Sequence, residues 1–116
     1  MVKKDLSIIF KFEDTGAVVQ KLRLEKKKIV LTQGSFDMVH IGHARYCAKA
    51  KSYGDVLLVG VDSDEKVRTR KGPDRPIVPQ EERLEMLSFL KSVDFVVLKP
   101  LDAPKYQLIK HVRPDV

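Results

Sequence analysis

The stretch KIVLTQGSFDMVHIGHARYCAKAKSYGDVLLVGV, residues 28–61, indicates how this chain folds. It contains two apolar runs, KIVLT and DVLLVGV, separated by the segment HIGHARYCAKAKSYG. Short apolar runs rich in Val and Ile are typical of buried strands, and the segment between them has the composition of a helix. We expect this helix to end at Gly54, because glycine is a common helix stop.

The same alternation continues on both sides of this stretch. Downstream, a polar segment that begins with a short helix is followed by a helix over 80–93, a third strand over 94–99 and a helix over 103–112. Upstream, residues 14–28 read as a helix that Asp14 or Thr15 caps. In each of three helices we expect a set of residues to face the core. These are Val18, Val19, Leu22 and Leu24 in the helix over 14–28, Leu84, Leu87 and Leu90 in the helix over 80–93, and Tyr106, Ile109 and Val112 in the helix over 103–112.

Apolar strands that alternate with helices predict a Rossmann-like α/β fold, a parallel sheet with helices on both faces. We expect one domain over 1–116, with a strand and helix extension at 1–27 and a core at 28–116. Asp115 and Val116 resemble the start of a further strand, so the expectation is that the C-terminal part of the domain is missing. Ligands bind such sheets beyond the carboxyl ends of the strands, where TQGSFDMVHIGH lies.

Composition narrows the partners and the compartment. The formal charge of +6 and the pI near 9.5 favour anionic partners such as phosphates or nucleotides. A single cysteine fits a reducing compartment, and the sequence has no apolar stretch of the ~20 residues that a membrane span needs. We therefore expect a cytoplasmic protein that does not enter membranes.

Two histidines three residues apart, at the predicted start of a helix, are the strongest functional signal. His40 and His43 share one face of a helical turn, and Gly42 between them keeps the surface open. The helix N-terminus favours an anion, and Gly34 permits a positive φ at the strand end. We therefore predict a phosphate-binding site, called the cradle below, formed by His40, Gly42 and His43 at the start of this helix. A bound polyphosphate would raise the pKa of both imidazole rings. The alternatives are surface or capping histidines, or a metal site that would draw on Asp37.

The residues GSFDMVHIGH, 34–43, resemble the signature G-x-F-D-x-x-H-x-G-H of the nucleotidylyltransferase superfamily, which includes cytidylyltransferases and adenylyltransferases. Residues 54–97 look most like the adenylyltransferase domain of the heptose-phosphate enzymes of lipopolysaccharide precursor synthesis. The resemblance covers roughly residues 14–98. It implies a Rossmann-like enzyme that transfers AMP from ATP to a sugar phosphate, such as heptose 1-phosphate, and releases pyrophosphate.

The resemblance also implies partners. Mg²⁺ would arrive with the nucleoside triphosphate and needs no direct protein ligand, and many relatives are homodimers. One alternative is a cytidylyltransferase that uses CTP and a polyol or amino-alcohol phosphate, and another is a nucleotide-binding module without catalysis. Nucleic-acid binding through the basic segment 66–75 is disfavoured, because no aromatic residues interleave with its cations.

Residue by residue, the resemblance assigns three groups of site residues. The catalytic group is His40, His43 and Lys71; the nucleotide and phosphate group is Gly34, Ser35, Phe36, Asp37, Gly42 and Arg83; the candidates for binding the acceptor are Asp64, Arg70 and Lys91. Asp64 has an alternative reading as part of a helix start, in which Asp62 and Glu65 form a capping box. The family's second motif, a Ser/Thr-rich turn followed by a basic residue, has no counterpart in residues 95–116.

Overall fold

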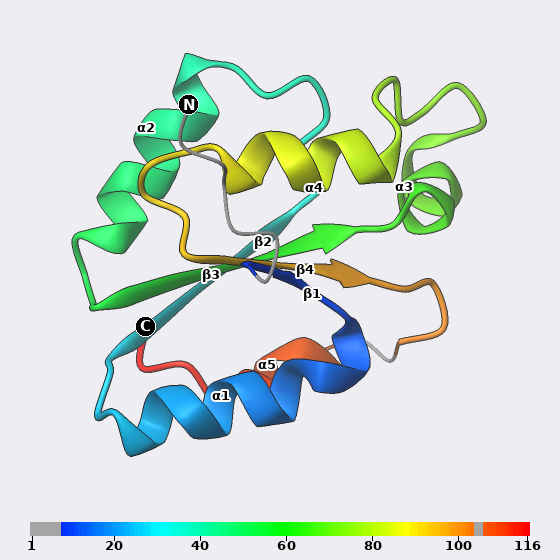
Figure 1. Ribbon diagram of the computed structural model, residues 1–116. Helices are drawn as coiled ribbons and strands as arrows, with labels where there is room; N and C mark the ends of the chain where they lie inside the picture. The colour runs from blue at the N-terminus through cyan, green and yellow to red at the C-terminus, as the bar shows by residue number, and fades with distance from the viewer. Residues whose placement is uncertain (1–7, 104–105) are drawn as a thin grey trace.

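A computed structural model describes residues 8–103 and 106–116 of the chain. Four parallel strands form one sheet in the order β1 (Ile9–Phe10), β4 (Phe95–Lys99), β3 (Val56–Asp62) and β2 (Ile29–Gly34) (Figure 1). All seven residues of β3 are buried, because this strand lies inside the sheet and both of its faces are covered. The Rossmann-like α/β fold predicted from the sequence is confirmed.

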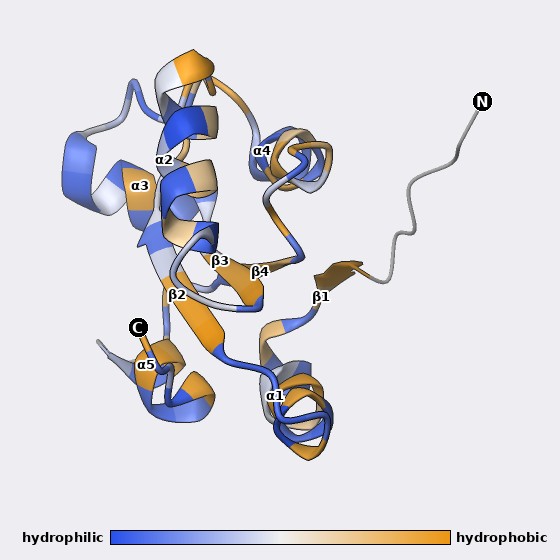
Figure 2. Ribbon diagram, turned by 90° about the vertical axis from the view of Figure 1, so that its left-hand side faces the viewer, coloured by the Kyte–Doolittle hydropathy of each residue, from blue (hydrophilic) through white to orange (hydrophobic). Residues whose placement is uncertain are grey.

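Helices cover the two faces of the sheet. Figure 1 shows α2 (Ile41–Lys51) and α4 (Gln80–Ser88) on one face, and α1 (Thr15–Leu24) and α5 (Gln107–Val112) on the other. A 3-10 turn, η2 (Phe12–Asp14), leads into α1, and α3 (Asp64–Lys71) follows β3 directly. Figure 2 shows that the strands between these layers are apolar and that the helices carry most of the hydrophilic residues.

Two apolar cores result, one on each face of the sheet. The core beneath α2 and α4 is built from Val30, Phe36, Cys47, Ala50, Leu57, Val59, Val61, Leu87, Val93 and Val96. The core above α1 and α5 is built from Val19, Leu22, Ile29, Val56, Leu58, Val97, Leu108 and Val112. Successive residues of β3 alternate between the two cores, as the two-residue period of a strand requires.

The predicted inward residues of the last helix are partly wrong. Leu108 and Val112 are buried, whereas Tyr106 and Ile109 are 59% and 38% exposed. The helix begins at Gln107, after Tyr106 has turned the chain with a φ of 71°, so Tyr106 lies outside the helix and Leu108, rather than Ile109, packs with Val112 into the core. Residues 104–105 of the predicted helix lie outside the described residues. Leu24, expected inward at the end of α1, is 78% exposed.

The strand order reverses at β2. The chain steps from β2 to β3 to β4 in one direction, and after α5 it returns to the other side of β2. There the Asp115 N–H donates to Ile29 O (2.9 Å), and the Leu31 N–H donates to Val116 O (3.1 Å). In open parallel sheets a ligand binds outside the carboxyl end of the strand where the order reverses. The carboxyl end of β2 leads into residues 35–40, where the sequence places the cradle.

In the part of the chain that the structure describes, no helix has the length and apolar character that crossing a membrane requires.

Candidate active site

The loop between β2 and α2 holds an unusual backbone. Phe36 and Met38 both have a φ of 53°, in the left-handed region that non-glycine residues seldom adopt. The ring of Phe36 is buried, and its centroid lies 5.7 Å from that of His43, so it packs beneath the histidine. Gly34 does not have the positive φ that the sequence suggests. A Cβ there would lie 3.2 Å from the Phe36 ring, so glycine makes room for this packing.

The two histidines start α2 by capping one another. The Gly42 N–H donates to His40 Nδ1 (3.0 Å), and the His40 N–H donates to His43 Nδ1 (3.1 Å). The ring centroids are 4.2 Å apart. Two of the N–H groups around the helix start are thus bound by imidazole nitrogens, in the way that Ser and Glu do in a capping box.

This capping sets the tautomer of both rings. A neutral imidazole carries its proton on one nitrogen and accepts on the other. Because Nδ1 of each ring accepts a backbone N–H, the proton of each ring belongs on Nε2. His40 is exposed and His43 is half-buried. Two Nε2–H donors are therefore available to an anion at the helix start, and neither needs a positive charge to donate.

The pKa of His43 also favours the neutral ring. Burial, together with the nearby His40, lowers the pKa of His43 below its ordinary value. The sequence predicts that a bound polyphosphate raises this pKa. In the protein without nucleotide the structure opposes protonation, because a proton on Nδ1 would displace the His40 N–H.

Asp37 anchors the segment that precedes α4. Its two carboxylate oxygens accept the backbone N–H groups of Ile77 and Val78, each at 2.8 Å. Burial alone would raise the pKa of Asp37, but these two donors and the charges of Arg83 and Arg75 lower it below its usual value. Each oxygen thus accepts one backbone N–H, so Asp37 orders the loop beside the cradle.

Arg83 is a buried connector between three segments. Its side chain is 1% exposed and donates to the carbonyl oxygens of Val78 (2.9 Å), Ser35 (2.6 Å) and Asp62 (2.8 Å). Nη2 also donates to Asp64 Oδ1 at 2.7 Å, in an ion pair. The guanidinium therefore ties the ends of β2 and β3 to the segment before α4. It faces carbonyl groups, so its role here is to position the loops.

A cavity of about 380 Å³ lies above the loop and the start of α2. Its polar lining includes Ser35, His43, Arg70 and Lys71, and Asp37 is the one acidic residue among the described residues that line it. Lys71 is exposed at the end of α3 and takes part in no ion pair within the described ranges. The imidazole of His43, the two cations and the nearby start of α2 make this cavity suitable for a polyphosphate.

The sequence model of the cytidylyltransferase-like family matches residues 31–116, which include the cradle, α3 and Arg83. The chain belongs to this family. The nucleotidylyltransferase superfamily that the residues GSFDMVHIGH predict is therefore confirmed.

Relatives of this cytidylyltransferase-like chain are similar over most of its length. The bifunctional protein HldE of a Nitratiruptor species is 49% identical over 105 residues, which are 90% of this chain and 22% of the relative. The bifunctional protein HldE of Sulfurimonas denitrificans is 47% identical over 104 residues, again 90% and 22%. The chain thus spans about a fifth of the length of these curated relatives.

A solved structure also resembles the cytidylyltransferase-like chain. The crystal structure of the lipopolysaccharide core biosynthesis protein from Thermoplasma volcanium GSS1 has a TM-score of 0.69 and 32% sequence identity. The match covers 77% of this chain and 70% of that one. The fold of this solved structure is therefore consistent with the family that the sequence model assigns.

The structure gathers most of the predicted site residues of the cytidylyltransferase-like domain around one loop. Those that line the cradle cavity are Gly34, Ser35, Phe36, Asp37, His43, Arg70 and Lys71, and His40 and Gly42 adjoin it at the start of α2. Arg83 lies behind them as the connector.

Two of the residues predicted to bind the acceptor, Lys91 and Asp64, do not line the cradle cavity. Lys91 is exposed in the turn before β4, at the amino-terminal edge of the sheet, so the length of a strand separates it from the cradle. Asp64 pairs with Arg83, and Ser63 caps α3 by accepting the Lys66 N–H at 3.2 Å. The capping box between Asp62 and Glu65 is therefore wrong.

The sequence reasoning missed Asp62 as a buried charge. This residue ends β3, is 1% exposed, and lies 2.8 Å from Arg70 Nη2 and 3.3 Å from Lys99 Nζ. Neither contact has the direction of a hydrogen bond, so the carboxylate is ion-paired without a hydrogen-bond donor in the described residues. The sequence does contain a signal for this buried charge, since Asp62 directly follows the apolar run DVLLVGV.

Proposed function

We propose that this domain transfers AMP from ATP to a sugar phosphate of the heptose 1-phosphate type and releases pyrophosphate. The pair of Nε2–H donors at the start of α2 carries the proposal, because both rings point their capping nitrogens inward and leave a donor for an anion. The resemblance of residues 54–97 to heptose-phosphate adenylyltransferases supports the choice of ATP and sugar phosphate. Similarity to bifunctional HldE proteins supports the same subgroup.

The chemistry suits a site without an activated nucleophile. An oxygen of the acceptor phosphate, already anionic at neutral pH, bonds to the α-phosphorus while the bond from that phosphorus to the bridging oxygen breaks. Pyrophosphate leaves with the electron pair. The site has to hold two anions in line and to neutralise the charge that grows on the leaving group. We assign donation to the triphosphate to His43 and Lys71, which line this cavity, and to His40, which lies at the start of α2 and lines a neighbouring cavity. Arg70 lines both this cavity and the second one.

Mg²⁺ belongs to the proposal as part of the substrate, the MgATP complex. No group of three or more potential metal-ligating side chains gathers within the described ranges. Asp37, the carboxylate nearest the cradle, already binds two backbone N–H groups. We therefore assign the ion to the phosphate oxygens. Localisation in the cytoplasm and a homodimer are further parts of the proposal, both based on the resemblance to the family.

The first test is a calorimetric titration of the chain with ATP and with CTP, each with Mg²⁺. Preference for ATP supports the adenylyltransferase, whereas preference for CTP replaces it with the cytidylyltransferase alternative. Pyrophosphate release with heptose 1-phosphate then measures turnover. ATP binding without pyrophosphate release for any sugar phosphate or polyol phosphate would favour a binding module.

Variants of the histidines test the cradle itself. His40→Asn keeps a side chain that caps helices well but removes the Nε2 donor, so it separates capping from phosphate binding. We expect His40→Asn and His43→Ala each to lower turnover by about 10²-fold or more, as loss of a transition-state donor does. His111→Ala changes the third histidine of the chain, exposed on α5, and should not alter turnover. Rates near those of the wild type in both cradle variants would refute the proposal.

A further inference from the structure

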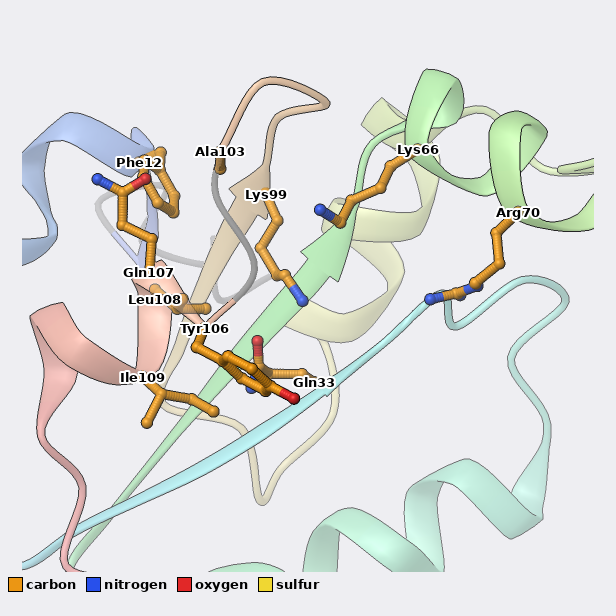
Figure 3. Close-up of a pocket in the computed structure, with 10 residues that line it drawn as sticks. All are labelled: Phe12, Gln33, Lys66, Arg70, Lys99, Ala103, Tyr106, Gln107, Leu108 and Ile109. Atoms are coloured by element: carbon orange, nitrogen blue, oxygen red, sulfur yellow. The ribbon is translucent and has the colours of Figure 1, made fainter.

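A second cavity, of about 400 Å³, opens beside the cradle at the carboxyl ends of the strands. Figure 3 shows Lys66 and Arg70 reaching into it from α3 and Lys99 from the end of β4, with their nitrogen atoms directed toward a common space. Gln33, from the end of β2, forms part of the opposite wall. Three cationic side chains from two separate elements therefore converge on one hollow.

The charge of this cavity is not balanced. No acidic side chain lines it within the described residues, and the nearest carboxylate in contact with its cations is that of the buried Asp62. Arg70 and Lys99 flank Asp62, and Lys66 forms no ion pair in the described part of the chain. Three positive charges face one negative charge, which leaves an excess of two. A cavity of this kind favours a dianion such as a phosphate monoester.

The second cavity adjoins the cradle. Gln33 and Arg70 line both cavities, and Arg70 Nη2 also donates to Ser35 Oγ at 2.8 Å, on the loop that forms the cradle. An acceptor that attacks the α-phosphorus in line must lie directly next to the triphosphate. A cationic hollow that shares a wall with the cradle meets this condition.

We propose that this cavity is the acceptor site, in which Lys66, Arg70 and Lys99 bind the phosphate of the incoming sugar phosphate. The inference rests on the proposed function and adds the place where the second substrate binds. Asp62 is a positioning residue, because its buried carboxylate holds the side chains of Arg70 and Lys99 at the wall. The Asp62 carboxylate pairs with the same two cations that we assign to the substrate phosphate.

The test measures the two substrates separately on the full chain. With Mg²⁺ and α,β-methylene-ATP bound in the cradle, heptose 1-phosphate is titrated by calorimetry, with inorganic phosphate and free heptose as partial probes. Lys66→Met and Lys99→Met keep most of the side-chain length and remove the charge. We expect each to weaken heptose 1-phosphate binding roughly 10- to 100-fold, as the loss of one charge-assisted hydrogen bond does. Lys110→Met, on the exposed side of α5, is the matched control and should change nothing.

A double variant separates substrate binding from the internal ion pair. If Lys99 served only to neutralise Asp62, then Asp62→Asn would restore the affinity of Lys99→Met. We expect no restoration, because the missing ammonium is the group that binds the substrate. Inorganic phosphate should compete with heptose 1-phosphate, and free heptose should not.

The outcomes distinguish failure of the acceptor site from failure of the proposed function. If the ATP analogue binds but Lys66→Met and Lys99→Met both bind heptose 1-phosphate like the wild type, the acceptor site is refuted and the proposed function stands. Restoration by Asp62→Asn refutes a direct role for Lys99. If neither ATP nor CTP binds the wild-type chain, the proposed function falls and the acceptor site falls with it.

Discussion

Replacement of Arg83 by Met is the most direct test of how the site is assembled. Arg83 is 1% exposed and makes four hydrogen bonds of 2.6–2.9 Å, three to carbonyl oxygens and one to Asp64. Methionine fills much of the same volume but leaves all four acceptors without a donor. Each buried acceptor left without a donor costs about 1–3 kcal/mol. Asp64 is 27% exposed in its side chain, so water replaces part of its lost partner, and we expect a total loss of about 3–5 kcal/mol. Domains of this size have a free energy of unfolding of about 5–15 kcal/mol, so the loss is a large fraction of the total.

The assay is urea unfolding followed by circular dichroism. With an m value of about 2 kcal/mol/M, this loss lowers the midpoint by about 2 M. Arg83→Lys serves as a milder variant, because it keeps a charge near Asp64 but cannot reach three carbonyl groups in a plane, and we expect an intermediate loss. Arg68→Met, on the exposed side of α3, is the control and should shift stability by less than about 0.5 kcal/mol.

The result that would refute the reasoning is a midpoint for Arg83→Met within about 0.3 M of the wild type, which at that m value is about 0.6 kcal/mol. A combination of unchanged stability with lost ATP binding would show that Arg83 contacts the phosphates, as the family resemblance of the sequence implies. The positioning role predicts the opposite order, in which stability falls first and ATP binding falls because the loops around the cradle lose their anchor.

Three further predictions concern the cradle. In Gly42→Ala the added Cβ would lie 2.7 Å from His40 Cε1, so the imidazole ring must move. Calorimetry should show that the affinity for ATP falls roughly tenfold. The melting temperature should change little, because the lost helix cap and the gained helix propensity are each worth about 1 kcal/mol and have opposite signs. Because folding lowers the pKa of His43, the unfolded chain binds a proton on this imidazole more readily than the folded chain does. The free energy of unfolding should therefore fall as the pH drops through about 6.5. In His43→Gln the urea midpoint should depend less on pH over the same range. Asp37→Asn retains only one good acceptor for two N–H groups and should cost about 1–3 kcal/mol, with faster hydrogen exchange at the two amides that it binds; unchanged exchange would contradict the anchoring role.

The strands and the place of the site could be predicted because their signals are local. Apolar runs such as DVLLVGV leave little choice but a buried strand, and a parallel sheet fixes which ends of its strands meet. The histidine pair could be recognised because its spacing and its glycine lie within four residues. The error in α5 has an equally local cause, since Tyr106 takes a left-handed conformation that the periodicity does not reveal.

The connections between distant segments could not be predicted in the same way. Arg83 contacts Ser35, 48 residues away, and Arg70 contacts the same residue from 35 residues away. Residue type gives no indication of such contacts, and a surface arginine paired with nearby glutamates was the ordinary expectation for Arg83. The buried charge of Asp62 escaped notice for the same reason, because Lys99 comes opposite it only when β3 and β4 pair, and Arg70 reaches it from α3.

The polar residues of the site divide into two groups by what their donors and acceptors already bind. Arg83 and Asp37 direct most of their hydrogen bonds to backbone groups, so they fix the shape of the loops and have little left for a ligand. His40 and His43 use only Nδ1 internally and keep Nε2 for a ligand. Because donors without an internal partner are the ones that can bind a ligand, we expect the chemistry of the proposed reaction to depend on the second group. The first group fixes the loop from which the histidines project, and Asp37 lies in the same short stretch of sequence as the two histidines, whereas Arg83 reaches the loop from α4.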